Sequence, residues 1–125
     1  MGVLPLLDLL YPLGYNVSMD IKNTVKLYAT PDGKVPFIEW LESLDKQVRY
    51  RVKERLDRVA LGNMGDHRAI DQGIWELRLT FGAGYRIYYA HEENSIILLL
   101  CAGDKSSQRK DIKKAIAYLQ NYLEE

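Results

Sequence analysis

Polar and apolar residues alternate from Asn23 to Thr30, in a stretch rich in β-branched and aromatic types, and this pattern predicts a half-buried strand. A turn is predicted at "PDGK", which begins at Pro31. From Pro36 onward, apolar residues recur every three or four positions, which predicts a short amphipathic helix. A second helix is predicted from about Lys46 to Ala60, and the two glycines of "LGNMGD" end it.

The period of the pattern changes in the second half of the chain. Three strands are predicted, at Ile74 to Thr80, Tyr85 to Ala90 and Ser95 to Cys101, and "FGAG" and "HEEN" are short enough to link them as hairpins. The third strand shows no alternation, so we expect it to be buried on both faces near the middle of a sheet. A final helix is predicted from about Ser106 to Leu123. The order is strand, two helices, three strands and helix, which predicts an α+β fold.

The first twenty residues form an apolar extension that we separate from a domain at residues 21–125. The extension contains prolines and an aspartate and has no basic residue ahead of its apolar stretch, so it is a poor signal peptide, and it is too short to span a bilayer. Met19 opens a more ordinary globular sequence. The extension is therefore either a mis-assigned start or a hydrophobic arm that packs on a neighbour, and we expect a chain that begins at Met19 to fold and act normally.

Composition limits the remaining possibilities. A length of 125 residues suits one domain with one core. The single cysteine, Cys101, lies in an apolar run, which indicates a core residue in a reducing, cytoplasmic compartment rather than a nucleophile. The formal net charge is +0, from 17 basic and 17 acidic residues, so a nucleic-acid partner must be argued from local charge.

Strand alternation places several polar side chains on one face of the predicted sheet. If the apolar sets face the helices, Glu76, Arg78, Arg86 and Tyr88 share an open face. Directly after the central strand, Lys105 and the backbone N–H groups at the start of the final helix are suited to hold an anion. The arrangement predicts an electropositive cleft for a phosphodiester with a base stacked beside it. The plain alternative is that Arg86 merely pairs with Glu76 across the hairpin.

Several motifs together resemble a known family. "GNMGD" (62–66), "GIWELR" (73–78), "GAGYRIYY" (82–89) and "LLCAGDKSSQRKDIKKA" (99–115), preceded by "DGKVPFIEWLESL", resemble the RelE/ParE toxin superfamily in its HigB-like, phage Gp49-like branch. The resemblance covers about residues 26–122. It implies a small antiparallel sheet of about four strands, packed by two N-terminal helices and one C-terminal helix.

The resemblance also implies a function. RelE-like members cut messenger RNA in the ribosomal A site without a metal, by driving the 2′-hydroxyl onto the adjacent phosphate. They are held silent by a cognate antitoxin, commonly a helix-turn-helix protein in this branch. We therefore expect a cytoplasmic toxin whose partners are an antitoxin, the ribosome and mRNA, with no membrane partner, no small-molecule cofactor and no metal. Two alternatives stay open: a ParE-like toxin that blocks DNA gyrase by binding, and an inactive module that only pairs with its antitoxin and co-represses an operon.

By position, the resemblance assigns Arg86 to the scissile phosphate, with Arg78 and Lys105 as further cations. The helix tyrosine of RelE falls near Asp111, so Asp104 and Asp111 are the candidates for proton transfer, and Arg86→Ala is expected to abolish toxicity and leave the fold intact. Ser106 or Ser107 is expected to cap the final helix, and the alternative is that the hydroxyl-rich "SSQ" binds phosphate. Further RNA contacts are expected from Tyr88, Gln108, His67, Arg51 and Arg55.

Two of these expectations have plain alternatives. Arg51 and Arg55 belong to the stretch from Lys46 to Arg58, which has six basic and two acidic residues and could bind ribosomal RNA, an acidic antitoxin segment or only solvent. His67 and His91 lie in predicted loops, where exposed histidines without a ligand are the default, and His67 is a minor catalytic candidate.

Overall fold

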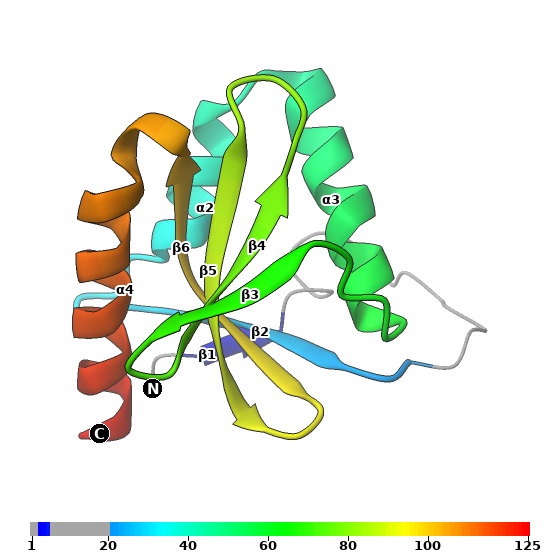
Figure 1. Cartoon of the computed structure of the whole chain (residues 1–125). Coiled ribbons are helices and arrows are strands. Elements are labelled where there is room, and N and C mark those ends of the chain that lie inside the picture. The colour runs from blue at the N-terminus through cyan, green and yellow to red at the C-terminus, as the bar shows by residue number, and fades with distance from the viewer. Residues whose placement is uncertain (1–2, 6–20) are drawn as a thin grey trace.

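The computed structural model describes residues 3–5 and 21–125, which form a mixed sheet with helices on both faces (Figure 1). In chain order the elements are β1 (Val3–Pro5), β2 (Thr24–Tyr28), α2 (Pro36–Ser43), α3 (Lys46–Ala60), β3 (His67–Asp71), β4 (Ile74–Leu79), β5 (Tyr85–Glu93), β6 (Ile96–Asp104), a 3-10 turn η1 (Lys105–Ser107) and α4 (Gln108–Leu123). The α+β class and the three helices agree with the sequence analysis, and α3 has the predicted bounds.

The sheet is larger than the expected four strands. Six strands lie in the order β1-β2-β6-β5-β4-β3 among the described residues. Every neighbouring pair is antiparallel except β2 and β6, which run parallel with Thr24 opposite Ile96 and Leu27 opposite Leu99. The parallel pair follows from the connection, because α2, α3 and the β3–β5 segments separate β2 from β6 and leave β2 free to join the open edge of β6.

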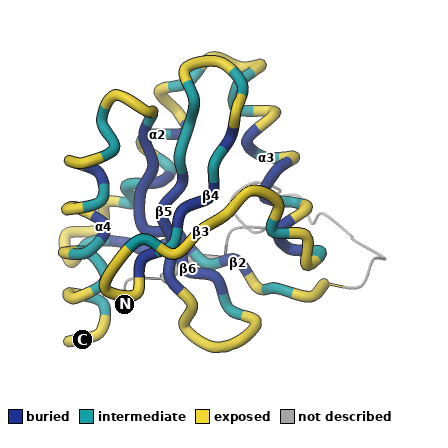
Figure 2. Tube along the Cα trace, viewed as in Figure 1, coloured by how far each residue is buried: buried dark blue, intermediate teal, exposed yellow. Residues whose placement is uncertain are grey.

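Two apolar clusters occupy opposite faces of the sheet. On one face, Leu77, Ile87 and Leu99 pack with Phe37 of α2 and Leu56 of α3. On the other face, residues of β4, β5 and β6 pack with α4, whose contribution includes Ala115, Ile112 and Leu119. Figure 1 shows α4 on one side of the sheet and α2 on the other. The central strand β6 is accordingly buried from Ile97 to Gly103, as its lack of alternation predicts (Figure 2).

The expected open face is therefore wrong. The face that carries Glu76, Arg86 and Tyr88 is the face that α4 covers, and Glu76 and Tyr88 are fully buried there. The apolar stripe of α4 needs a sheet face of its own, and β6 supplies apolar side chains on both sides.

Strand β3 was missed because its sequence, "HRAID", carries little of the hydrophobic signal of a strand. Four of its five residues are exposed, as Figure 2 shows, and it forms the sheet edge next to β4. His67 lies in this strand and His91 lies in β5, so both are strand residues rather than the loop residues expected.

The N-terminal expectation falls mostly outside the described residues, which leave out 1–2 and 6–20. Within the extension, β1 pairs antiparallel with β2, with Val3 opposite Tyr28 and Pro5 opposite Lys26. The separation of residues 1–20 from the domain at residues 21–125 stays a prediction. In the described part of the chain, no helix combines the length and the apolar character that crossing a bilayer requires.

Candidate functional site

A buried carboxylate organises the polar residues beneath the first turns of α4. Glu76 of β4 has a fully buried side chain. Its Oε1 accepts from Arg68 Nε at 3.1 Å and from Arg86 Nη1 at 3.2 Å, and its Oε2 accepts from Gln108 Nε2 at 2.9 Å. The partners come from β3, β5 and α4, so one carboxylate joins three elements. Because its charge is paired and hydrogen-bonded on both oxygens, the cost of burying it is offset.

Arg86 is only partly satisfied by this pairing. Its side chain is 11% exposed, and one nitrogen binds Glu76 as the plain alternative predicted. Its Nε is buried and has no hydrogen-bond partner among the described residues. A buried N–H group without an acceptor is uncommon in a folded protein. The Arg86 guanidinium therefore keeps a donor that Glu76 does not use, and the exposed 11% of the side chain is the part that an anion from solvent can approach.

The other two predicted cations lie at the same end of the sheet. Arg78 is the register partner of Arg86, so their side chains share a face; the Arg78 side chain is 40% exposed, with Nε 3.9 Å from Asp66 Oδ2. Lys105 follows β6 directly and is exposed. It lies beside the β4–β5 turn, since a Cβ built on Gly84 would be 3.7 Å from Lys105 Cβ. Arg86 is thus recessed, Arg78 and Lys105 are accessible, and all three lie where β4 and β6 end.

Asp104 caps the turn that leads into α4. Its Oδ1 accepts from the Ser106 backbone N–H at 2.8 Å and from the Ser106 hydroxyl at 2.5 Å, and Ser107 Oγ accepts from the Asp104 backbone N–H at 3.3 Å. Asp104 thus caps η1, whereas Ser107 occupies the N-cap position of α4, as expected, but its side chain makes no capping hydrogen bond there. The Ser106 hydroxyl, with the backbone N–H groups behind it, lowers the pKa of Asp104. A carboxylate held in this way is a weak proton acceptor.

Asp111 lies closer to Arg86 than its sequence position indicates. Its side chain is buried, and its Oδ2 accepts from Ser107 Oγ at 2.5 Å. The Asp111 carboxylate and the Ser107 hydroxyl both pack closely against Gly103. A Cβ added to Gly103 would lie 1.9 Å from Asp111 Oδ2 and 2.6 Å from Ser107 Oγ. Gly103 is the register partner of Arg86. The glycine therefore lets α4 bring a carboxylate and a hydroxyl against the strand next to Arg86.

Tyr88 and Gln108 do not have the free side chains expected of RNA contacts. Tyr88 is fully buried beneath α4, and burial, with the neighbouring Glu76 charge, raises its pKa far above the ordinary tyrosine value. It cannot stack on a base in this arrangement. Gln108 donates to Glu76, so it supports the buried carboxylate. The alternation argument placed Tyr88 on the same face as Glu76, which the register confirms, and assigned that face to solvent instead of α4.

A second polar region lies between α3 and the end of β4. It is a cavity of about 310 Å³ with four arginines and two acidic residues in its wall. Arg55, expected to contact RNA, is buried and donates to the carbonyl oxygens of Met64, Asp66 and Arg78 at 3.0 to 3.3 Å. Arg51 is exposed, and its guanidinium carbon lies 4.0 Å from the centre of the Phe81 ring. Arg55 is thus a structural residue, whereas the exposed Arg51 side chain is accessible to a ligand.

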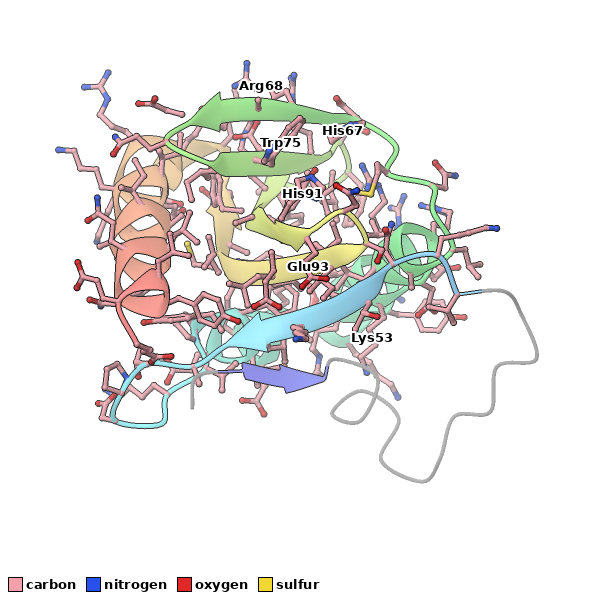
Figure 3. The ribbon with its side chains drawn as sticks, turned by 90° about the horizontal axis from the view of Figure 1, so that it is seen from below. Lys53, His67, Arg68, Trp75, His91 and Glu93 are labelled. Atoms are coloured by element: carbon pink, nitrogen blue, oxygen red, sulfur yellow. The ribbon has the colours of Figure 1, made fainter. Side chains whose placement is uncertain are left out.

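His67 is separated from Arg86 by the sheet. Residues 67, 75 and 91 lie on the face of α2 and α3 (Figure 3). There the Trp75 ring stacks on the His67 ring, with 5.9 Å between the ring centres, and meets the His91 ring edge-on, with 5.4 Å between the centres. His67 Nδ1 lies 2.8 Å from the Gly65 carbonyl oxygen. Within residues 3–5 and 21–125, no three His, Cys, Asp or Glu side chains gather closely enough to hold a metal ion.

Sequence reasoning did not find the position that three residues take in these two regions. Arg68 was missed with β3, and recognising "HRAID" as a strand paired with "IWELR" would have placed it opposite Glu76. Ser107 was considered as a cap or a phosphate contact, and its spacing of four residues to Asp111 is the signal for their contact. Arg58 lies seven residues after Arg51, which puts both on one stripe of α3.

Comparison with known proteins adds two findings. Residues 39–121 match the model of a family described as phage-derived protein, Gp49-like. An uncharacterized protein of Haemophilus influenzae is 41% identical over 80 residues, which is 63% of this chain and 81% of that protein. The family match includes Arg78, Arg86, Lys105 and Asp111.

Proposed function

Because this chain belongs to the Gp49-like family of phage-derived proteins, a family of RelE- and HigB-like toxins, we propose that it is a toxin that cuts messenger RNA on the ribosome. The observation that carries the proposal is the state of Arg86. Its buried Nε lacks an acceptor among the described residues, and Arg78 and Lys105 lie at the same end of the sheet. An arginine with an unsatisfied donor and two further cations beside it suit a phosphodiester.

In this proposal the cleavage needs no group beyond the chain and the RNA. Arg86 binds a non-bridging oxygen of the scissile phosphate, and Arg78 and Lys105 stabilise the charge that develops on the phosphorane. The ribose 2′-oxygen attacks phosphorus, and the bond to the 5′-oxygen breaks. The products are a 2′,3′-cyclic phosphate and a 5′-hydroxyl end.

Proton transfer is assigned to Asp111 and Lys105. The 2′-hydroxyl proton passes to Ser107 while the Ser107 proton passes to Asp111, with which it already shares a hydrogen bond. Lys105 gives a proton to the leaving 5′-oxygen. Asp104 is the weaker candidate for the base because it caps η1 and its pKa is lowered.

Expression of the chain in cells tests this function. We expect growth arrest and 5′-hydroxyl RNA ends inside translated reading frames. DNA damage that depends on gyrase, with intact transcripts, would instead assign the chain to binding of gyrase. Normal growth would assign it to an inactive module that pairs with an antitoxin, the partner that its family implies.

A further inference from the structure

The cavity between α3 and the end of β4 holds more positive charge than its own acidic residues balance. Four arginines, at positions 51, 55, 58 and 78, line it together with Glu54 and Asp66. Arg78 lies near Asp66, at 3.9 Å. Among the described residues, no ion pair joins Arg51 or Arg58 to an acidic side chain. Two exposed guanidinium groups on one side of this cavity are therefore available to a ligand.

The cavity has a fixed inner wall. Arg55 ties α3 to the segment before β3 and to β4 through its bonds to the carbonyl oxygens of Met64, Asp66 and Arg78. Burial, with the charge of Arg58 nearby, lowers the pKa of Arg55. The like charges of these arginines repel one another, so an anion bound between Arg51 and Arg58 would relieve that repulsion.

The rim of the cavity offers a flat cationic surface. Arg51 lies over the Phe81 ring, with its guanidinium carbon 4.0 Å from the ring centre, and this contact holds the planar group beside the β4–β5 turn. Nucleic-acid bases stack on guanidinium planes as they do on aromatic rings. An acidic peptide would pair with the charge of Arg51, but its carboxylates do not stack on a guanidinium plane as a base does.

Arg78 connects this cavity with the site of the proposed reaction. It lines the cavity and is the register partner of Arg86. We propose that Arg51 and Arg58 bind a phosphate of the RNA strand that neighbours the phosphate at Arg86, so that the strand passes the end of β4 toward α3. This inference rests on the proposed function, since it assigns a second contact of the same RNA.

Binding of an uncleavable RNA by the full chain tests the proposal. The probe is a fluorescein-labelled, fully 2′-O-methylated RNA of eight nucleotides, and anisotropy is read at several salt concentrations. The double substitution Arg51→Ala/Arg58→Ala is expected to weaken binding roughly tenfold and equally for different base sequences. Each lost phosphate contact is expected to make the slope of log K against log salt shallower by about 0.7.

Lys53→Ala is the matched control. It removes the same charge from the same helix, and Lys53 is two residues from Arg51, which turns it away from the cavity wall. We expect wild-type affinity and slope for this variant. Circular dichroism of all variants shows whether they are folded. We expect that they are, because Arg51 and Arg58 are exposed and their removal takes no partner from a buried group among the described residues.

Two results would overturn the inference. The first is an Arg51→Ala/Arg58→Ala chain that binds the RNA like Lys53→Ala, or a wild-type chain that shows no binding at low salt. The second is a hexaglutamate peptide whose binding requires Arg51 and Arg58 while RNA binding does not, which would make the cavity a site for an acidic segment. If the wild type cuts transcripts in cells and either result is found, only this inference fails. If it cuts none, the proposed function fails whatever the anisotropy shows.

Discussion

Arg86 Nη1 lies 3.2 Å from Glu76 Oε1 across the β4–β5 pair, and the Glu76 carboxylate is fully buried. The predicted catalytic arginine is therefore also the counterion of a carboxylate in the protein interior. Because of this double role, a substitution of Arg86 changes stability and any reaction together, so a loss of activity in that variant cannot be assigned to the reaction alone.

Arg86→Ala is expected to lower the free energy of unfolding by about 3 kcal/mol, because it leaves a buried carboxylate short of one partner. This differs from the expectation from sequence that the fold would stay intact. Urea unfolding at pH 7 measures the change. Arg109→Ala, which removes an exposed charge from α4, is the control and should stay within about 0.5 kcal/mol of wild type. An Arg86→Ala chain as stable as the Arg109 variant would show that the pair contributes nothing.

Gly103→Ala should destabilise the chain by roughly 1 to 3 kcal/mol through overpacking. The new methyl group would lie 1.9 Å from Asp111 Oδ2, and Gly103 does not have a positive φ, so the cost is steric. Thermal unfolding of Gly103→Ala, Asp111→Ala and the double variant checks this. In the double variant we expect the Gly103→Ala penalty to shrink; an additive loss would refute the proposed contact.

Arg55→Ala is expected to cost about 3 kcal/mol of stability because three carbonyl oxygens lose a charged donor in a buried setting. Arg51→Ala removes the same kind of side chain one turn earlier on α3, where it is exposed. Denaturant midpoints for the two variants should therefore differ clearly, and similar midpoints would contradict the structural role of Arg55.

The Asp104 cap should make part of the stability depend on pH. Its folded-state pKa is lowered by hydrogen bonds, so the stabilisation is present above the unfolded pKa and is lost as the pH falls through the folded one. Asp104→Ala should cost about 1 kcal/mol at pH 7. The difference in the free energy of unfolding between wild type and variant should become smaller as the pH falls below about 4. A gap that stays constant down to pH 2 would show that the carboxylate charge is irrelevant to the cap.

The sequence predicted the helices and the central strands well because their signals are local. The bounds of α3 follow from apolar spacing and terminal glycines, and the uniform burial of β6 follows from a run without alternation. That burial requires helices on both faces of the sheet, and the same helices cover both faces of β4 and β5, which the alternation within those two strands does not show. Strand β3 gave no local signal, because it is stabilised by pairing with β4 and mostly exposed.

The candidate site was only partly predictable for the same reason. Alternation placed Arg78 and Arg86 on one face, which the register confirms. It could not show that Glu76 and Tyr88 on that face are buried, because a polar strand face resembles a solvent face unless the helix that covers it is known. The contact of Asp111 with Gly103 depends on how α4 docks, which no spacing within one segment encodes.

The central claim is that Arg78, Arg86 and Lys105 hold the phosphate at which RNA is cut. Lys105 tests it most directly, because its side chain is exposed and, unlike Arg86, is not the counterion of the buried carboxylate. The measurement is the rate at which purified chain cuts mRNA on stalled ribosomes, for wild type, Lys105→Ala and the exposed control Lys114→Ala. We predict a loss of about 10² to 10³ for Lys105→Ala with unchanged thermal stability, and wild-type cutting for Lys114→Ala. Equal cutting by all three chains, or none by the wild type, would contradict the account.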